Sequence, residues 1–119
     1  MKMRELLIAL PALKKLGSQD LPLKILYRVF RVLKKLDENF DFYNKRREEI
    51  TVKYCVLRGD KYIPRDDCRD EYDMKFAELL NMDVELDDIE PVIIPMSENL
   101  VLSYNDLVSL EAFVQIEGD

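Results

Sequence analysis

The first half of the chain repeats apolar side chains at the spacing of an α-helix. Residues 3–16 place leucines near every third or fourth position, and we expect Pro11 to kink or restart this helix, because proline lacks a backbone donor. Residues 17–20 form a break, after which Pro22 occupies a first-turn position that tolerates proline. The pattern predicts a kinked N-terminal helix followed by one long helix.

An apolar seam with steps of three and four residues runs along the long helix. Its members are Leu26, Phe30, Leu33, Leu36 or Asp37, Phe40, Tyr43, Arg47, Ile50 and Tyr54. Such a seam is typical of a helix packed on one face by the rest of its domain, and also of a coiled coil that self-associates. Its aromatic members favour packing within the domain, so we expect Leu33, Phe40 and Ile50 to face the core. We expect the helix to end at residues 58–60.

The second half of the chain contains shorter segments, some with the apolar spacing of a helix and others with the alternation of a strand. The predicted elements are a short helix over residues 70–81, extended segments over 84–86, 92–94 and 100–102, and a closing helix over 103–114. Ser103 and Asp106 have the spacing of a capping box at the start of that last helix. The predicted fold class is α+β and mostly helical, with a small two- or three-stranded sheet.

The length of the chain predicts one domain, and its charge divides that domain into a basic half and an acidic half. A chain of 119 residues has room for a single core, so we expect one domain over residues 1–119. Residues 1–60 carry 14 lysines and arginines against 8 aspartates and glutamates, whereas residues 61–119 carry 4 against 16. The chain thus has a basic helical half (1–57) and an acidic α+β half (58–119). We favour an acidic half that lies over the basic half, although two surfaces for two partners would give the same pattern.

The composition removes the commonest kinds of catalytic and metal chemistry. The chain has no histidine, which excludes histidine bases and histidine-activated nucleophiles, and it has no glycine-rich phosphate loop. Cys55 and Cys68 are too few for a zinc site or a disulfide framework. The turn-like stretch between them would allow a single bridge, but in a reducing cell we expect two free thiols. The acidic residues between 66 and 73 enclose Arg69, and we interpret them as a solvated loop that enters a helix. We expect no cofactor, no metal and no enzymatic activity. We also expect the protein to be cytoplasmic.

Two charged patterns are candidate partner-binding surfaces. The acidic run alternates with Val84, Leu86 and Ile89, which predicts an edge strand whose carboxylates face solvent and a basic partner. Its acidic members are Asp83, Glu85, Asp87, Asp88 and Glu90. On the long helix, Lys24, Arg28, Arg31 and Lys35 form one stripe that could follow phosphates. An isoelectric point near 4.8 argues against nucleic acid, so we expect this stripe to be solvated or covered by the acidic half.

The order of short motifs along the chain resembles a known family. The motifs are LPALKKL at 10–16, LPLK at 21–24 followed by Tyr27 and Arg28, RREEITVKY at 46–54, FAELL at 76–80, VEL at 84–86, LVLS at 100–103 and DLVSLEAF at 106–113. Together they resemble a family of small, largely uncharacterised proteins of tailed phages and prophages of Gram-positive bacteria. The family often has a proline in the first turn of its last helix, where this chain has Tyr104 and Asn105. The resemblance implies a phage context and supplies no catalytic residues.

These observations predict a non-enzymatic protein of phage type that acts by protein–protein interaction in the host cytoplasm. One alternative is a virion or tail assembly component that self-associates through the long helix. Another is an inhibitor of a host defence or replication enzyme that presents an acidic surface. Nucleic acid and membranes are not expected partners.

Overall fold

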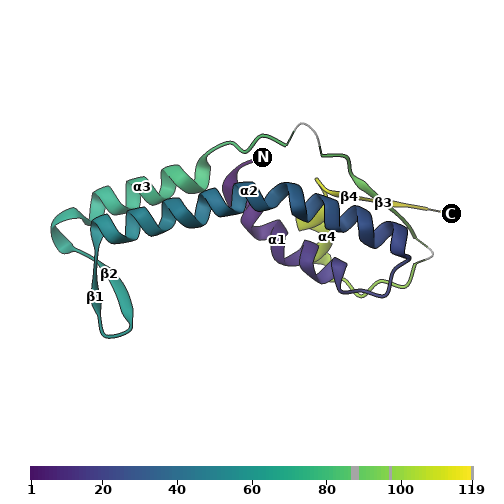
Figure 1. The fold of residues 1–119 in the computed structure, drawn as a ribbon, viewed down its shortest axis with the longest axis horizontal. Coiled ribbons are helices and arrows are strands. Elements are labelled where there is room, and N and C mark those ends of the chain that lie inside the picture. Colours follow the sequence, from purple (N-terminus) through teal and green to yellow (C-terminus); the bar gives the residue numbers. More distant parts are fainter. Residues whose placement is uncertain (87–88, 97, 119) are drawn as a thin grey trace.

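A single long helix organises the fold. The computed structural model describes residues 1–86, 89–96 and 98–118, and it measures 59 × 31 × 22 Å along its principal axes. Helix α2 (Leu23–Tyr54) has 32 residues, which corresponds to about 48 Å at the α-helical rise. Helices α1 (Met3–Gly17) and α4 (Tyr104–Leu110) lie beside its first half, whereas α3 (Arg69–Asn81) runs back along its second half (Figure 1). The α+β, mostly helical class predicted from the sequence is confirmed.

The first half of α2 buries a different face from the one that the seam predicts. The buried side chains are Ile25, Val29, Val32 and Leu36, whereas Leu26 and Leu33 are half-buried and Phe30 is 56% exposed. Leu36 belongs to the predicted seam, and Leu26 and Leu33 pack against the core from half-buried positions, so the seam was wrong for Phe30 and its centre is rotated by about one position. Val29 faces α1, because a methyl group added at Gly17 would lie 3.6 Å from Val29 Cγ1, which is an ordinary van der Waals contact. In the second half of α2 the predicted Tyr43, Ile50 and Tyr54 are buried, and Phe40 is half-buried.

A β-hairpin replaces the predicted last turn of the long helix. Strands β1 (Cys55–Arg58) and β2 (Lys61–Pro64) pair antiparallel, with Val56 opposite Ile63 and Leu57 opposite Tyr62. These β-branched and aromatic residues favour strand over helix, and Gly59 supplies the positive φ of 63° that the tight turn requires. The helix therefore ends at Tyr54 rather than at residues 58–60.

The C-terminal segment forms a parallel pair of strands. Strand β3 (Val92–Pro95) pairs with β4 (Val114–Glu117), and α4 lies in the connection between them. The predicted extended segment 92–94 is confirmed, but 84–86 and 100–102 are not strands, and the closing helix ends at Leu110 instead of near Val114. Residues 114–117 form β4 instead, because their apolar side chains alternate with polar ones and complete the parallel ladder.

One hydrophobic cluster includes buried side chains from both halves of the chain. Its fully buried members include Met3, Leu13, Leu36, Ile94 and Phe113. Among the described helices, none combines the length and apolar character that a bilayer crossing requires.

Candidate functional site

The predicted basic stripe lines an open groove beside β3. Arg28, Arg31 and Lys35 form one wall on α2, and residues 89–93 form the other wall around a volume of about 600 Å³. Arg28 and Arg31 are exposed, and Lys35 is half-buried. Glu90 lines the same groove, so the structure brings together three predicted cations and one predicted carboxylate. We call Lys24, Arg28, Arg31 and Lys35 the cation row.

The predicted acidic run does not form one edge strand in the described part of the chain. Glu85 lines a second groove with Lys34 and Lys35, of about 490 Å³, while Asp83 forms an isolated antiparallel bridge with Lys2 at the start of α1. Val84 is buried, with its backbone N–H donating to the Met1 carbonyl over 2.7 Å. Asp87 and Asp88 lie outside the described residues. The acidic side chains that are described therefore point to separate surroundings, two of them beside the cations of α2.

A line of exposed apolar side chains lies next to the cation row. Leu23, Tyr27 and Phe30 are 81%, 57% and 56% exposed, and their i, i+4, i+7 spacing places them on one face of α2. At 100° per residue, this face lies opposite Ile25, Val29, Val32 and Leu36. The rings of Tyr27 and Phe30 stack, with centroids 6.2 Å apart. We call these three residues the apolar ridge.

Sequence reasoning missed the apolar ridge because it placed Phe30 in the core. The signal that could have found it is the presence of two apolar stripes on one helix. A helix that is apolar on its core side and again on the opposite side has more hydrophobic surface than its own domain can bury. The ridge is the part left uncovered.

The electrostatics of the first half of α2 are uniformly positive. Residues 23–36 contain five lysines and arginines and no acidic residue, and the first turn has no carboxylate to complement the helix dipole. Among the ion pairs between described residues, none involves Lys24, Arg28 or Arg31. Lys24 in the first turn opposes the dipole, so this charge does not stabilise the helix. In the groove beside β3, Arg28 and Arg31 share their surroundings with one described carboxylate, that of Glu90.

The free edge of β3 is protected against pairing with another strand. The N–H groups of Val92 and Met96 donate to carbonyls on the β4 side over 2.8 and 2.7 Å, so positions 91, 93 and 95 face away from β4. Two of these three positions are the prolines Pro91 and Pro95, which have no N–H to donate. An added strand would therefore find a single backbone donor, that of Ile93.

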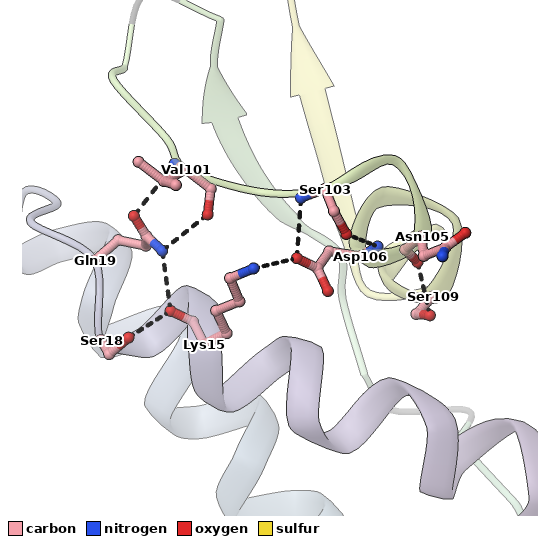
Figure 2. Close-up of polar contacts among 8 residues, drawn as sticks. All are labelled: Lys15, Ser18, Gln19, Val101, Ser103, Asn105, Asp106 and Ser109. Atoms are coloured by element: carbon pink, nitrogen blue, oxygen red, sulfur yellow. Dashed lines mark hydrogen bonds and ion pairs between the residues drawn. The ribbon is translucent and has the colours of Figure 1, made fainter.

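A polar clasp holds the C-terminal segment against α1 (Figure 2). The side-chain amide of Gln19 accepts from the Val101 N–H over 3.3 Å and donates to the Val101 carbonyl over 3.2 Å, as a neighbouring strand would. Lys15 Nζ donates to Asp106 Oδ2 over 2.7 Å, and Ser103 with Asp106 forms the predicted capping box. The Lys15 ammonium and the Ser103 N–H together lower the pKa of Asp106. The clasp joins the chain between β3 and α4 to α1, which packs on α2.

The remaining candidate groups lie at the other end of α2. Cys55 and Cys68 are free, and burial, followed by the neighbouring Cys68 sulfur, raises the pKa of the Cys55 thiol. The Cys68 thiol donates to the Tyr54 carbonyl with an S···O distance of 3.6 Å. Asp66 and Asp67 are exposed at the short 3₁₀ turn that precedes α3, where Arg65 Nε lies 4.0 Å from Asp67. Cys55 also lines an open groove of about 550 Å³ with Tyr62, Tyr72 and Phe76, where no other described thiol or carboxylate except Glu48 joins it.

No protein-family model, curated protein or solved structure matches this chain.

Proposed function

We propose that this protein acts without catalysis by binding another protein, through the exposed face of the first half of α2. The observation that carries the proposal is the apolar ridge, which points directly away from the protein's own core. Three large apolar side chains at i, i+4 and i+7 are the pattern with which a helix contacts a partner groove or a partner helix. A contiguous apolar patch rimmed by charged side chains is typical of an interaction site.

The proposal includes the phage context given by the sequence resemblance, and it places the partner in the host cytoplasm. A self-associating assembly component would use the same ridge, so oligomeric state decides between that alternative and a separate partner. The alternative with an acidic inhibitory surface has less support, because Glu85 and Glu90 each line a groove with cations of α2. A carboxylate beside cations contributes less to a negative surface than one that stands alone.

The test compares three forms of the full chain. The ridge variant is Tyr27→Ser with Phe30→Ser, and the matched control is Val52→Ser with Met74→Ser, which removes two apolar side chains that are 70% and 62% exposed at the other end of the molecule. Each form is crosslinked in infected or lysogenic Gram-positive cells and then purified. A protein recovered with wild type and control is next purified and titrated against all three forms.

We expect one protein to bind wild type and control with equal affinity. Its affinity for the ridge variant should be at least about tenfold lower, because aromatic anchors dominate interface energies. Equal binding to all three forms would show that the interface lies elsewhere. Sedimentation equilibrium provides the second measurement. A wild-type dimer that the ridge variant abolishes would support self-assembly instead.

A further inference from the structure

The apolar ridge and the cation row are adjacent strips of one helical surface. Tyr27 and Arg31 are i, i+4 neighbours, and Arg31 and Arg28 are i, i+3 neighbours, so a body that rests on the ridge meets Arg31 first and Arg28 on the far side of it. Neither Arg28 nor Arg31 has an ion-pair partner among the described residues. The surface thus offers apolar anchors on one side and available positive charge on the other.

From this juxtaposition, and building on the proposed function, we propose that the partner presents an acidic amphipathic helix. Its apolar side chains pack on Leu23, Tyr27 and Phe30, and its flanking carboxylates bind Arg28 and Arg31 at the mouth of the groove. Charge complementarity supports this partner, because residues 23–36 carry five cations, and the groove that Arg28 and Arg31 line contains a single described carboxylate, that of Glu90. The strip from residue 23 to residue 35 is about 18 Å long, which matches a partner helix of about 12 residues.

The backbone beside the groove favours a helix over a strand. A strand that entered the groove would have to pair with the free edge of β3, and Pro91 and Pro95 leave only Ile93 as a donor there. A helix satisfies its own backbone hydrogen bonds and needs only side-chain contacts. The i, i+4, i+7 spacing of the ridge is itself the spacing of a helix–helix contact.

The same surface is less suited to a nucleic acid strand. Base stacking requires open aromatic faces, whereas the rings of Tyr27 and Phe30 stack on each other with an interplanar angle of 28°.

The test uses two synthetic helical peptides of about 14 residues with identical leucine positions. One peptide has glutamate on both flanks of its leucine stripe, and the other has lysine at the same positions. A third probe is an oligothymidylate of similar length. Each is labelled and titrated by fluorescence anisotropy against the full chain at about 20 mM and about 500 mM salt, where screening is weak and strong respectively.

We expect the glutamate peptide to bind at least about tenfold more tightly than the lysine peptide at low salt, with the difference reduced at high salt. The charge variant is Arg28→Glu with Arg31→Glu, and it should lose this preference. The matched control is Arg58→Glu with Lys61→Glu at the hairpin tip, which changes the net charge equally and keeps two like charges opposite each other. The control should bind as wild type does. Thermal melts of both variants confirm that each is folded.

Three results would overturn the inference. Equal affinity for both peptides would show that charge has no role in binding. Tighter binding of oligothymidylate than of the glutamate peptide would assign the surface to nucleic acid. An equal loss of affinity for the glutamate peptide in both charge variants would show that only the net charge of the protein matters. If the glutamate peptide fails while the ridge variant still loses a cellular partner, the proposed function stands and the partner is not an acidic helix. If the ridge variant also keeps every partner, both proposals fail.

Discussion

Lys15 Nζ lies 2.7 Å from Asp106 Oδ2, and this ion pair connects two residues that are 91 positions apart in the sequence. The contact connects the last turn of α1 to the first turn of α4, where Asp106 also accepts from the Ser103 N–H. One carboxylate therefore serves both as a helix cap and as a tertiary contact between the basic and acidic halves of the chain.

Replacing Asp106 by Asn should destabilise the protein at neutral pH and have little effect in acid. The Lys15 ammonium, followed by the Ser103 N–H, lowers the pKa of Asp106 in the folded state. A carboxylate whose folded pKa is lowered stabilises the fold above its unfolded pKa, and this stabilisation is lost as pH falls through the folded pKa. Thermal unfolding from neutral pH to about pH 2 should therefore show the melting difference between wild type and Asp106→Asn shrinking. Asp60→Asn at the hairpin tip controls for the loss of one charge, and a difference that is constant with pH would contradict the assignment.

Truncating Val29 should cost more stability than truncating its larger neighbour Phe30. Val29 is 1% exposed against α1, whereas Phe30 is 56% exposed on the apolar ridge. Val29→Ala removes two buried methyl groups and leaves a cavity, for about 2 kcal/mol, while Phe30→Ala should cost below about 1 kcal/mol. Both changes go from a β-branched or aromatic residue to alanine within one helix, so helix propensity changes similarly. Urea unfolding measures both values, and the reverse order would restore the seam predicted from the sequence.

Replacing Gly59 by alanine should weaken the β-hairpin through its backbone alone. Gly59 has a φ of 63°, and a Cβ built there meets nothing within 4 Å. The substitution should therefore cost about 1 to 2 kcal/mol of hairpin stability, because an L-residue with a side chain disfavours this left-handed backbone conformation. We expect faster amide exchange of residues 56, 58, 61 and 63 in the variant. Gly118→Ala makes the same chemical change where no positive φ is required. Equal protection in the two variants would show that the turn does not depend on Gly59.

Cys55 should alkylate slowly at neutral pH. Burial and the neighbouring Cys68 sulfur raise the pKa of the Cys55 thiol, so little reactive thiolate is present. Iodoacetamide should modify Cys55 more slowly than it modifies free glutathione, and the rate should rise with pH. Cys68→Ser removes one cause of the raised pKa and should accelerate the reaction. An unchanged rate in that variant would show that the two sulfurs do not interact.

The elements most accurately predicted from the sequence are those set by local periodicity. The bounds of α1 and α3, the start of α2 and the Ser103–Asp106 cap follow from apolar spacing and capping chemistry, which act within a few residues. The β1–β2 hairpin was missed because Val56 and Leu57 continue the apolar pattern of the helix before them. Strand β4 was missed because its pairing with β3 is non-local, and a short apolar run fits a helix end equally well.

The candidate site was predicted only in part for a related reason. The stripe containing Arg28, Arg31 and Lys35 follows from helical spacing, and its position opposite Glu90 requires the tertiary fold. The apolar ridge depends on which face of α2 the rest of the domain covers. The packing of α1 against Val29 is a tertiary contact, and spacing within α2 alone does not reveal it.

The unbroken length of α2 has a mechanical consequence. Tyr27 on the ridge and Tyr54, which precedes the exposed hairpin, belong to the same helix, and the 27 rises from one to the other span about 40 Å. Figure 1 shows the β1–β2 hairpin at the end of α2 that lies away from α1. A straight helix does not bend appreciably over this distance unless a proline, a bulge or an inserted side chain interrupts it, and α2 contains no proline. Two bodies attached at its two ends would be held at a fixed spacing and orientation.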